Sequence, residues 1–127
     1  MDSDANQPLR LAIVGAGTIG TIHALASRRV PGVQVRVVCS RTPTSARTLA
    51  LRLGARAVTA LDEALSAPDV DAVLVATPTF LHAEQALAAL RAGKHVICEK
   101  PLARDLASAE EMAATAREAG LHLLTGH

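Results

Sequence analysis

Leu9 to Gly20 read LRLAIV-GAGTIG, a short apolar run followed by three closely spaced glycines. An apolar run of this length that stops at glycine is typical of a strand buried on both faces of a sheet. Residues 18–30 then carry apolar side chains at three- and four-residue steps, which predicts a helix that Pro31 and Gly32 end. Strand, glycines and helix in this order predict the opening unit of a parallel α/β sheet.

The alternation of strand and helix continues along the chain. We predict further strands at 33–39, 57–58, 71–76, 95–99 and 121–125, and helices at 44–53, 61–66, 80–92 and 105–119. The short connections imply right-handed crossovers, which place helices on both faces of a parallel sheet. We therefore expect an α/β fold, a doubly wound parallel sheet of the Rossmann type, over residues 9–127. Residues 1–8 are expected to be a disordered or frayed lead-in.

The composition excludes several classes of protein. Half of the 127 residues are apolar, a fifth are charged and the net charge is +1, so the chain has neither a disordered composition nor a basic footprint for nucleic acid. Phe80 is the only aromatic residue, which leaves no platform for stacking bases. Residues 11–27 carry no charge, but their glycines, threonines and histidine, and the acidic lead-in before them, argue against a membrane span or an export signal.

The two cysteines, Cys39 and Cys98, are too few for a secreted disulfide scaffold. Both fall in predicted strands, so we expect buried thiols in a reducing, cytoplasmic compartment. Neither a C-x-x-C nor an H-x-x-x-H pattern occurs, which predicts no metal site.

The three glycines match G-x-G-x-x-G, the pattern of a dinucleotide-binding turn. Gly15 would allow the tight turn, Gly17 would let a pyrophosphate approach the backbone, and Gly20 would let the helix lie close to the strand. Free N–H groups at the positive end of the helix would then hold the phosphates. The residues predicted to do so are Gly15, Ala16, Gly17, Thr18, Ile19 and Gly20. The alternative is a glycine turn that serves packing alone.

The end of the second predicted strand favours NADP over NAD. A dinucleotide site usually carries an acidic residue there, which holds the ribose 2′-hydroxyl. This chain has Ser40 and Arg41 instead, and no Asp or Glu occurs between Asp4 and Asp62. A hydroxyl and a guanidinium suit a 2′-phosphate. The alternative is that the arginine is solvated or stacks on adenine whichever cofactor is bound.

Further segments carry a family resemblance. Besides the glycine motif with His23, they are Ala76-Thr77-Pro78 with His82-Ala83-Glu84, Ala92-Gly93-Lys94-His95-Val96, Cys98-Glu99-Lys100-Pro101-Leu102-Ala103 and Gly126-His127. With these residues the chain resembles, over residues 9–127, the cofactor domain of the Gfo/Idh/MocA family. The family takes its name from glucose–fructose oxidoreductase, inositol dehydrogenase and rhizopine catabolism. The resemblance implies an NAD(P)-dependent oxidoreductase that acts on sugars, cyclitols or related hydroxy and keto compounds.

The resemblance also implies roles for individual residues. Lys100 would be the catalytic residue, because the matching family lysine contacts the substrate oxygen and assists proton movement. The cofactor would contact Ala76, Thr77, Pro78, His82, Glu99, Lys100 and Pro101. Lys100 also lies at the carboxyl end of a predicted strand, where open α/β sheets bind their ligands. The alternative for this lysine is a salt bridge or a solvated amine.

The other histidines carry weaker signals. His23 lies on the predicted helix after the glycines and could pack against the sheet or meet the ligand. His95 and His122 begin predicted strands at the edge away from the ligand, and we expect both to be structural.

Members of this family continue into a second α/β domain, which supplies most of the substrate pocket and the oligomer interface, and we expect the 127 residues to represent the cofactor domain without it. We therefore expect the chain alone to bind NADP(H) weakly, to turn over little, and to form an oligomer only with that domain. The alternative is a non-catalytic module that senses a dinucleotide or acts with a partner chain. A methyltransferase also has a glycine-rich first turn, but Arg41 and Glu99-Lys100-Pro101 argue against it.

Overall fold

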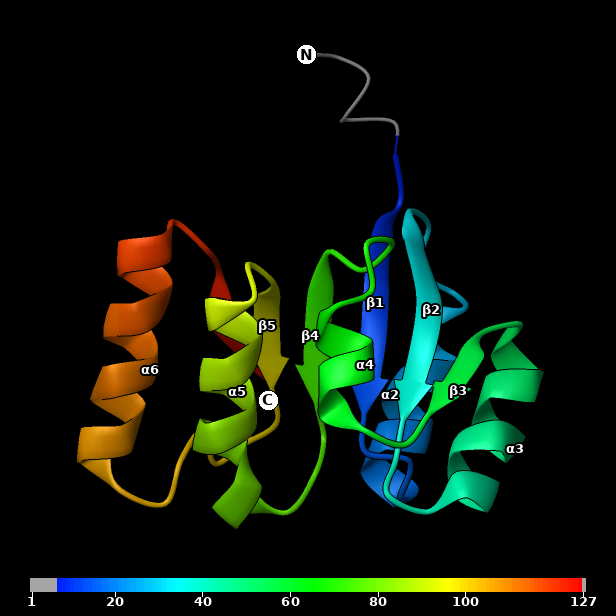
Figure 1. Ribbon diagram of the computed structural model, residues 1–127, viewed down its shortest axis with the longest axis horizontal. Helices are drawn as coiled ribbons and strands as arrows, with labels where there is room; N and C mark the ends of the chain where they lie inside the picture. The colour runs from blue at the N-terminus through cyan, green and yellow to red at the C-terminus, as the bar shows by residue number, and fades with distance from the viewer. Residues whose placement is uncertain (1–6, 127) are drawn as a thin grey trace.

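The computed structural model describes residues 7–126, so residues 1–6 of the expected lead-in, and His127, lie outside it. The described residues form a six-stranded sheet in the order β3-β2-β1-β4-β5-β6, in which every neighbouring pair is parallel. The strands are β1 (Leu9–Val14), β2 (Val33–Cys39), β3 (Arg56–Val58), β4 (Ala72–Val75), β5 (His95–Cys98) and β6 (Leu123–Thr125). The order reverses between β1 and β4, which confirms the predicted doubly wound Rossmann fold (Figure 1).

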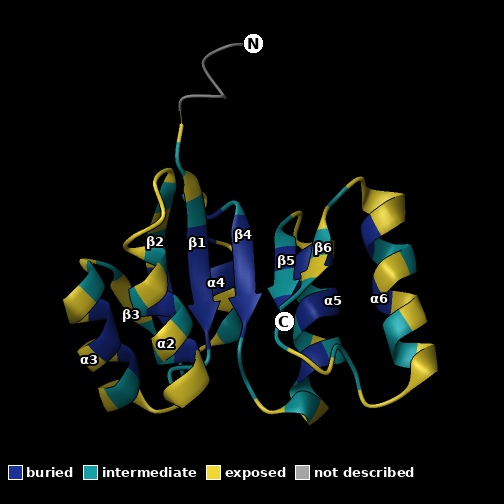
Figure 2. Ribbon diagram, turned by 180° about the vertical axis from the view of Figure 1, so that it is seen from behind, coloured by how far each residue is buried: buried dark blue, intermediate teal, exposed yellow. Residues whose placement is uncertain are grey.

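Helices cover both faces of the sheet. They are α2 (Thr18–Ser27), α3 (Pro43–Leu53), α4 (Leu61–Leu65), α5 (His82–Arg91) and α6 (Leu106–Ala119), with a single 3-10 turn, η1 (Thr79–Leu81), before α5. One buried cluster joins α4, α5 and α6 to the sheet, and a second joins α2 and α3 to the opposite face. Along β1, Ala12 and Val14 belong to the first cluster and Ile13 to the second, as the two-residue period of a strand requires. Figure 2 shows the resulting burial of β1 and β4.

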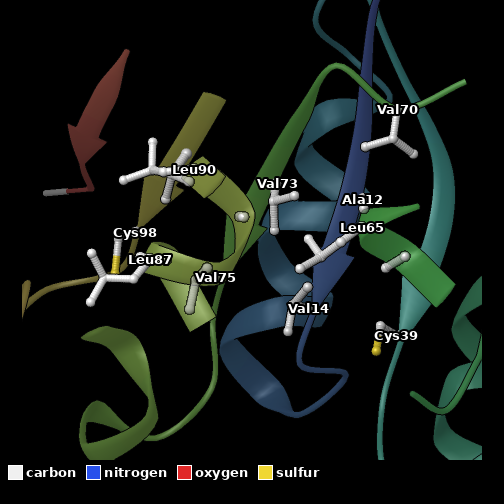
Figure 3. Packing of buried hydrophobic residues seen from close by; sticks show 14 of the residues in the cluster. Ala12, Val14, Cys39, Leu65, Val70, Val73, Val75, Leu87, Leu90 and Cys98 are labelled. Atoms are coloured by element: carbon white, nitrogen blue, oxygen red, sulfur yellow. The ribbon is translucent and has the colours of Figure 1, made fainter. Parts of the chain in front are cut away.

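The larger of the two clusters fixes the helix that precedes β5. Val73 and Val75 of β4 pack with Leu87 and Leu90 of α5, and none of the four side chains is more than 9% exposed (Figure 3). Burying a leucine contributes about 1.5–3 kcal/mol relative to leaving it in water. This packing holds α5 against β4 and thereby positions the loop between them, which carries part of the predicted site.

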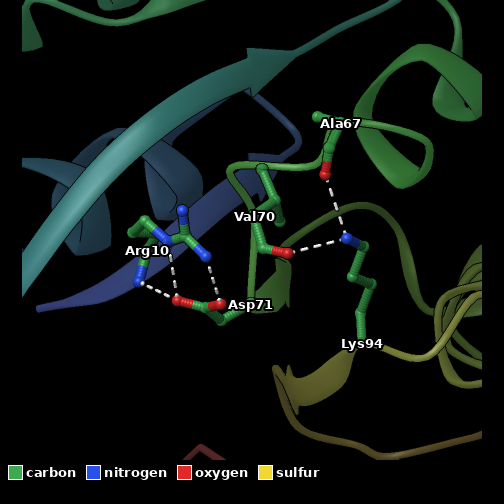
Figure 4. Close-up of polar contacts among 5 residues, drawn as sticks. All are labelled: Arg10, Ala67, Val70, Asp71 and Lys94. Atoms are coloured by element: carbon green, nitrogen blue, oxygen red, sulfur yellow. Dashed lines mark hydrogen bonds and ion pairs between the residues drawn. The ribbon is translucent and has the colours of Figure 1, made fainter. Parts of the chain in front are cut away.

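Polar contacts tie β1, β4 and β5 together at the amino edge of the sheet (Figure 4). The Asp71 carboxylate accepts hydrogen bonds from the backbone N–H of Arg10 at 2.9 Å and from its guanidinium at 2.9 and 3.1 Å. The hydrogen bond from this guanidinium lowers the pKa of Asp71. Lys94 Nζ, just before β5, donates to the carbonyl oxygens of Ala67 and Val70 at 3.0 and 2.7 Å. These contacts lie at the edge opposite to the predicted site.

Two helices differ from the prediction, one at its end and one at its start. The helix predicted for residues 18–30 ends at Ser27, because the next three N–H groups bond to carbonyls three residues back and Pro31 then follows. The helix predicted for residues 80–92 begins as the 3-10 turn η1 and becomes α-helical at His82. The remaining predicted elements agree with the structure to within two residues at each end.

Candidate cofactor-binding site

The predicted site residues follow the carboxyl ends of neighbouring strands, at the lower edge of the sheet in Figure 1. Backbone pairing continues past the strand ends. The N–H of Gly15 donates to Cys39 O at 2.9 Å, that of Ala76 to Val14 O at 2.8 Å, and that of Glu99 to Val75 O at 3.0 Å. The glycine loop, the turn after β4 and the segment after β5 are therefore placed by the sheet itself, at the point where its strand order reverses.

The three glycines of the motif differ in how closely other atoms surround them. A Cβ at Gly20 would overlap the Gly15 carbonyl oxygen, and a Cβ at Gly15, where φ is +108°, would lie 2.7 Å from Ala76 O. These two glycines are therefore explained by packing between α2, the loop and β4. A Cβ at Gly17 would meet nothing within 4 Å. The protein itself does not require glycine there, whereas close approach by a ligand would.

The first turn of α2 provides hydrogen-bond donors. Gly17 is the N-cap, no side chain caps the helix, and its first turn contains no acidic residue. The N–H of Thr21 is bonded to Gly17 O at 2.9 Å. The N–H groups that precede it, those of Thr18, Ile19 and Gly20, have no intrahelical acceptor at a helix start. They lie at the partially positive end of the helix dipole, which suits a phosphate.

A cavity of about 550 Å³ opens beside this helix start. It brings together residues predicted from the sequence to bind the cofactor: Gly15, Ala16, Gly17, Ser40, Arg41, Ala76, Thr77 and Pro78. Sequence reasoning did not assign the other residues that line it, which are Val14, Cys39, Thr42, Thr59, Leu61, Phe80, Leu81, Glu84 and Gln85. Of these, Glu84 belongs to a segment with a family resemblance, but Thr59 and Leu61 carry no comparable signal.

The end of β2 is open to solvent on one side. The Ser40 hydroxyl accepts a hydrogen bond from the Thr42 N–H at 3.2 Å, which leaves its own proton free to be donated. Arg41 is exposed and has no hydrogen bond or ion pair within residues 7–126. Cys39, the last residue of β2, is buried, and desolvation and the nearby Glu63 carboxylate raise its pKa to about 11. This end of β2 therefore offers a neutral thiol, a hydroxyl and a cation.

The segment after β5 approaches the site from the other side of β4. Lys100 is exposed, and the Lys100–Pro101 peptide bond is cis. Glu99 is partly buried, and its Oε2 lies 3.1 Å from His23 Nε2 on α2. Glu99, Lys100 and Pro101 do not line the 550 Å³ cavity. The structure thus places them beside it rather than in its wall.

His82 also lies behind the cavity rather than in its wall. Its side chain is 1% exposed, with Nε2 2.7 Å from Thr77 O and Nδ1 2.9 Å from Pro101 O. Backbone carbonyl oxygens thus occupy both ring nitrogens, and the ring does not line the cavity. Direct contact between His82 and a cofactor stays a prediction. At the opposite edge, the His122 N–H donates to His95 Nδ1 at 3.0 Å, which suits the structural role expected of these two residues.

A family model for Gfo/Idh/MocA proteins, described as an oxidoreductase family with an NAD-binding Rossmann fold, matches residues 9–127. The chain belongs to the Gfo/Idh/MocA family. Within that family, an inositol 2-dehydrogenase from Mycolicibacterium smegmatis is 42% identical over 118 residues, which are 91% of this chain and 34% of that enzyme. The resemblance noted from the glycine motif and Glu99-Lys100-Pro101 is therefore confirmed.

Solved structures of Gfo/Idh/MocA-like proteins agree with this assignment. GenD2 from gentamicin A biosynthesis, in complex with NAD, has a TM-score of 0.92 and 40% identity and is matched over 94% of this chain and 34% of its own. KijD10, a 3-ketoreductase from Actinomadura kijaniata in complex with NADP and TDP-benzene, has a TM-score of 0.91 and 39% identity, over 94% and 37% of the two chains. A nicotinamide cofactor is thus supported, in either its NAD or its NADP form.

The chain spans about a third of the length of the relatives it matches, from 30% to 38% of the first eight. Among residues 7–126, no helix has both the length and the hydropathy needed to cross a membrane. No group of three His, Cys, Asp or Glu side chains in that same part of the chain could hold a metal ion.

Proposed function

We propose that this chain holds the cofactor of an NADP-dependent oxidoreductase that interconverts a hydroxyl and a carbonyl group on a sugar, a cyclitol or a related compound. The observation that carries the proposal is the open space at Gly17, which packing does not explain, beside a cavity lined by the loops after β1, β2 and β4. The substrate class is inferred from the family and from the named activity of its inositol-oxidising relative.

The residues present fit a dinucleotide. Gly15 to Gly20 would hold the pyrophosphate through backbone N–H groups at the start of α2. The turn Ala76-Thr77-Pro78 would lie against the nicotinamide ribose, and Thr77 is held there because its hydroxyl donates to Gln85 Oε1 on α5. When bound, the nicotinamide ring gives or accepts the hydride.

Lys100 is the group of this chain proposed to act on the substrate. Its ammonium is exposed at the carboxyl edge, in the loop that starts at Glu99. An ammonium there can donate a hydrogen bond to the substrate oxygen, stabilise negative charge on it, and pass a proton to or from it. Because positioning accounts for about 7–11 kcal/mol of such a barrier, and this chain supplies one wall of the site, we infer little turnover by the 127 residues alone.

The preference for NADP rests on Arg41 and Ser40. Among the residues that line the cavity, Arg41 is the only cation and lies next to a free hydroxyl proton at the end of β2. A 2′-phosphate would accept from both, whereas a 2′-hydroxyl prefers a carboxylate at this place. Two buried free cysteines accord with the cytoplasmic location that we infer. An oligomer is inferred only for a longer form of the protein.

The experiment is calorimetric titration of the 127-residue chain with NADP and with NAD. Arg41→Ala should weaken NADP binding about 10-fold or more, the loss of one charge-assisted hydrogen-bonded contact, and should leave NAD binding unchanged. Arg29→Ala, an exposed arginine beyond the end of α2, is the matched control and should alter neither affinity. Equal losses for both cofactors would refute the phosphate assignment, and failure of the unaltered chain to bind either would refute the function.

A further inference from the structure

His82 joins two turns that the proposed function places on either side of the reacting centre. It is the first residue of α5, and its ring is enclosed, with 1% of the residue exposed. Nε2 lies 2.7 Å from the carbonyl oxygen of Thr77, in the turn after β4. Nδ1 lies 2.9 Å from the carbonyl oxygen of Pro101, in the loop that carries Lys100.

The chemistry of these two contacts restricts the protonation state of the ring. A carbonyl oxygen accepts hydrogen bonds and never donates one. A neutral imidazole has a single N–H, so one of the two contacts would set a ring lone pair against a carbonyl lone pair at less than 3 Å. Only the imidazolium ion, with a proton on each nitrogen, donates to both oxygens. Each distance is within the range of a charge-assisted hydrogen bond.

We propose that His82 is a buried imidazolium that clasps the Thr77 and Pro101 carbonyls, and that loss of its proton releases one of the two turns. His82 is thus a positioning residue, and the role given to it rests on the proposed function. The clasp sets the distance between the turn predicted to contact the nicotinamide ribose and the loop that presents Lys100. Its release would leave the glycine loop and the end of β2 in place.

Several titratable groups lie on the segments next to the His82 ring. The loop between β4 and α5 contains no titratable residue, and α5 itself carries Glu84 two residues along. The segment on the other side of the ring carries Glu99, Lys100, Arg104 and Asp105. Cys98 is buried there, and desolvation and Glu99 raise its pKa to about 11, so it stays neutral.

Two features of the site disfavour a positive charge on the ring. The ring is buried, and His82 lies at the start of α5, which is the positive end of the helix dipole. The clasp favours the charge through two hydrogen bonds to carbonyl dipoles that neutral imidazole could not both make. The two effects predict opposite outcomes in mildly acidic solution. Burial alone predicts a neutral ring, and the clasp predicts a charged one.

The test follows the His82 ring by long-range ¹H–¹⁵N spectra of the 127-residue chain labelled at histidine. At pH 5.5 we expect protons on both ring nitrogens, and with rising pH the Nδ1 or Nε2 proton is lost together with shifts in the amide signals of Thr79 and Leu102. A single protonated nitrogen at pH 5.5 would overturn the proposal. His95→Gln, at the far edge of the sheet, should leave this behaviour unchanged and helps assign the His82 signals.

A second measurement links the clasp to the site. As the pH rises through that transition, NADPH should bind about 2- to 10-fold more weakly, the loss of one hydrogen bond that orders the site. Binding of 2′,5′-ADP, which lacks the nicotinamide, should not follow the transition. In His82→Gln both ligands should bind with the same pH dependence. If NADPH does not bind while both nitrogens are protonated, the proposed function fails and the clasp stands. If NADPH binds without the pH step, the positioning role fails.

Discussion

His23 Nε2 on α2 lies 3.1 Å from Glu99 Oε2 in the segment after β5, although the two residues are 76 positions apart in the sequence. The same oxygen also packs closely against Gly126, where an added Cβ would lie 2.7 Å from it. The helix that starts at the glycine motif is therefore linked directly to the residue next to Lys100. The sequence left open whether His23 packs or meets the ligand, and in the structure it bonds a neighbouring side chain.

Replacing His23 should cost little stability. The pair is partly exposed, with 37% and 21% of the two side chains accessible, so His23→Ala should lower the free energy of unfolding by no more than about 1 kcal/mol. Urea denaturation measures the change. Ile22→Ala, which removes an exposed side chain from the same helix, should have a smaller effect. A loss of several kcal/mol in His23→Ala would mean that the contact supports the fold itself.

Alanine at Gly17 and at Gly20 should separate binding from folding. Gly20→Ala forces a Cβ into the Gly15 carbonyl and should destabilise the protein by about 1–3 kcal/mol or more. Gly17→Ala meets open space, but it replaces the N-cap of α2 by a poorer capping residue and should lower stability by no more than about 1 kcal/mol. It should nonetheless weaken NADPH binding about 10- to 100-fold, because the Cβ would displace a phosphate from the backbone N–H groups. Thermal unfolding and calorimetric titration measure the two quantities, and unchanged affinity in a folded Gly17→Ala would contradict the phosphate site.

Lys100→Met should separate binding from turnover. The variant keeps most of the unbranched side chain and removes the ammonium, so the dissociation constant for NADPH should stay within about twofold, a change of less than 0.5 kcal/mol. Turnover should fall by about 10²-fold or more wherever that of the unaltered protein can be measured, which is the usual contribution of a general acid or base. Steady-state kinetics of NADPH oxidation provides the readout. Equal turnover in both proteins would refute the proposed catalytic role of Lys100.

Leu90→Ala should test the packing that holds α5. The side chain is 1% exposed within the larger buried cluster, and its truncation should lower the free energy of unfolding by about 2–5 kcal/mol. Leu51→Ala is the control, because Leu51 on α3 is 78% exposed and should change stability by no more than about 0.5 kcal/mol. Guanidinium denaturation at one temperature compares them. Similar losses in both variants would contradict the described burial.

Acid should weaken the ion pair between Arg56 and Asp69. The guanidinium donates to the carboxylate at 2.7 and 2.9 Å, and this hydrogen bond lowers the pKa of Asp69 from 3.8 to about 2. A lowered folded-state pKa stabilises the protein above the unfolded value and loses that effect as the pH falls, here between about 4 and 2. Asp69→Asn should flatten this part of the curve of unfolding free energy against pH. Glu118→Gln, an exposed carboxylate on α6, should leave it as steep as before.

The fold was accessible from the sequence because the central strands β1 and β4 are mostly apolar runs and the longer helices have their own periodicity. The glycines proposed to bind phosphate were accessible for a related reason, since strand, loop and helix are contiguous in the sequence. Thr59 and Leu61 were not, because they reach the cavity only when β3 and α4 are placed beside β2. The two bonds of His82 were likewise hidden, since Pro101 is 19 residues away and no periodicity relates them.

Arg10, Asp71 and Lys94 fasten the strands at the edge farthest from the glycine loop, through contacts that share no residue with the cavity. Changes in the loops at the cavity therefore leave these contacts between the strands intact. Under the proposed assignment, Arg41 is the exposed residue that would select between NADP and NAD, and it makes no ion pair within residues 7–126. Its substitution should therefore change the cofactor preference at little thermodynamic cost to the fold.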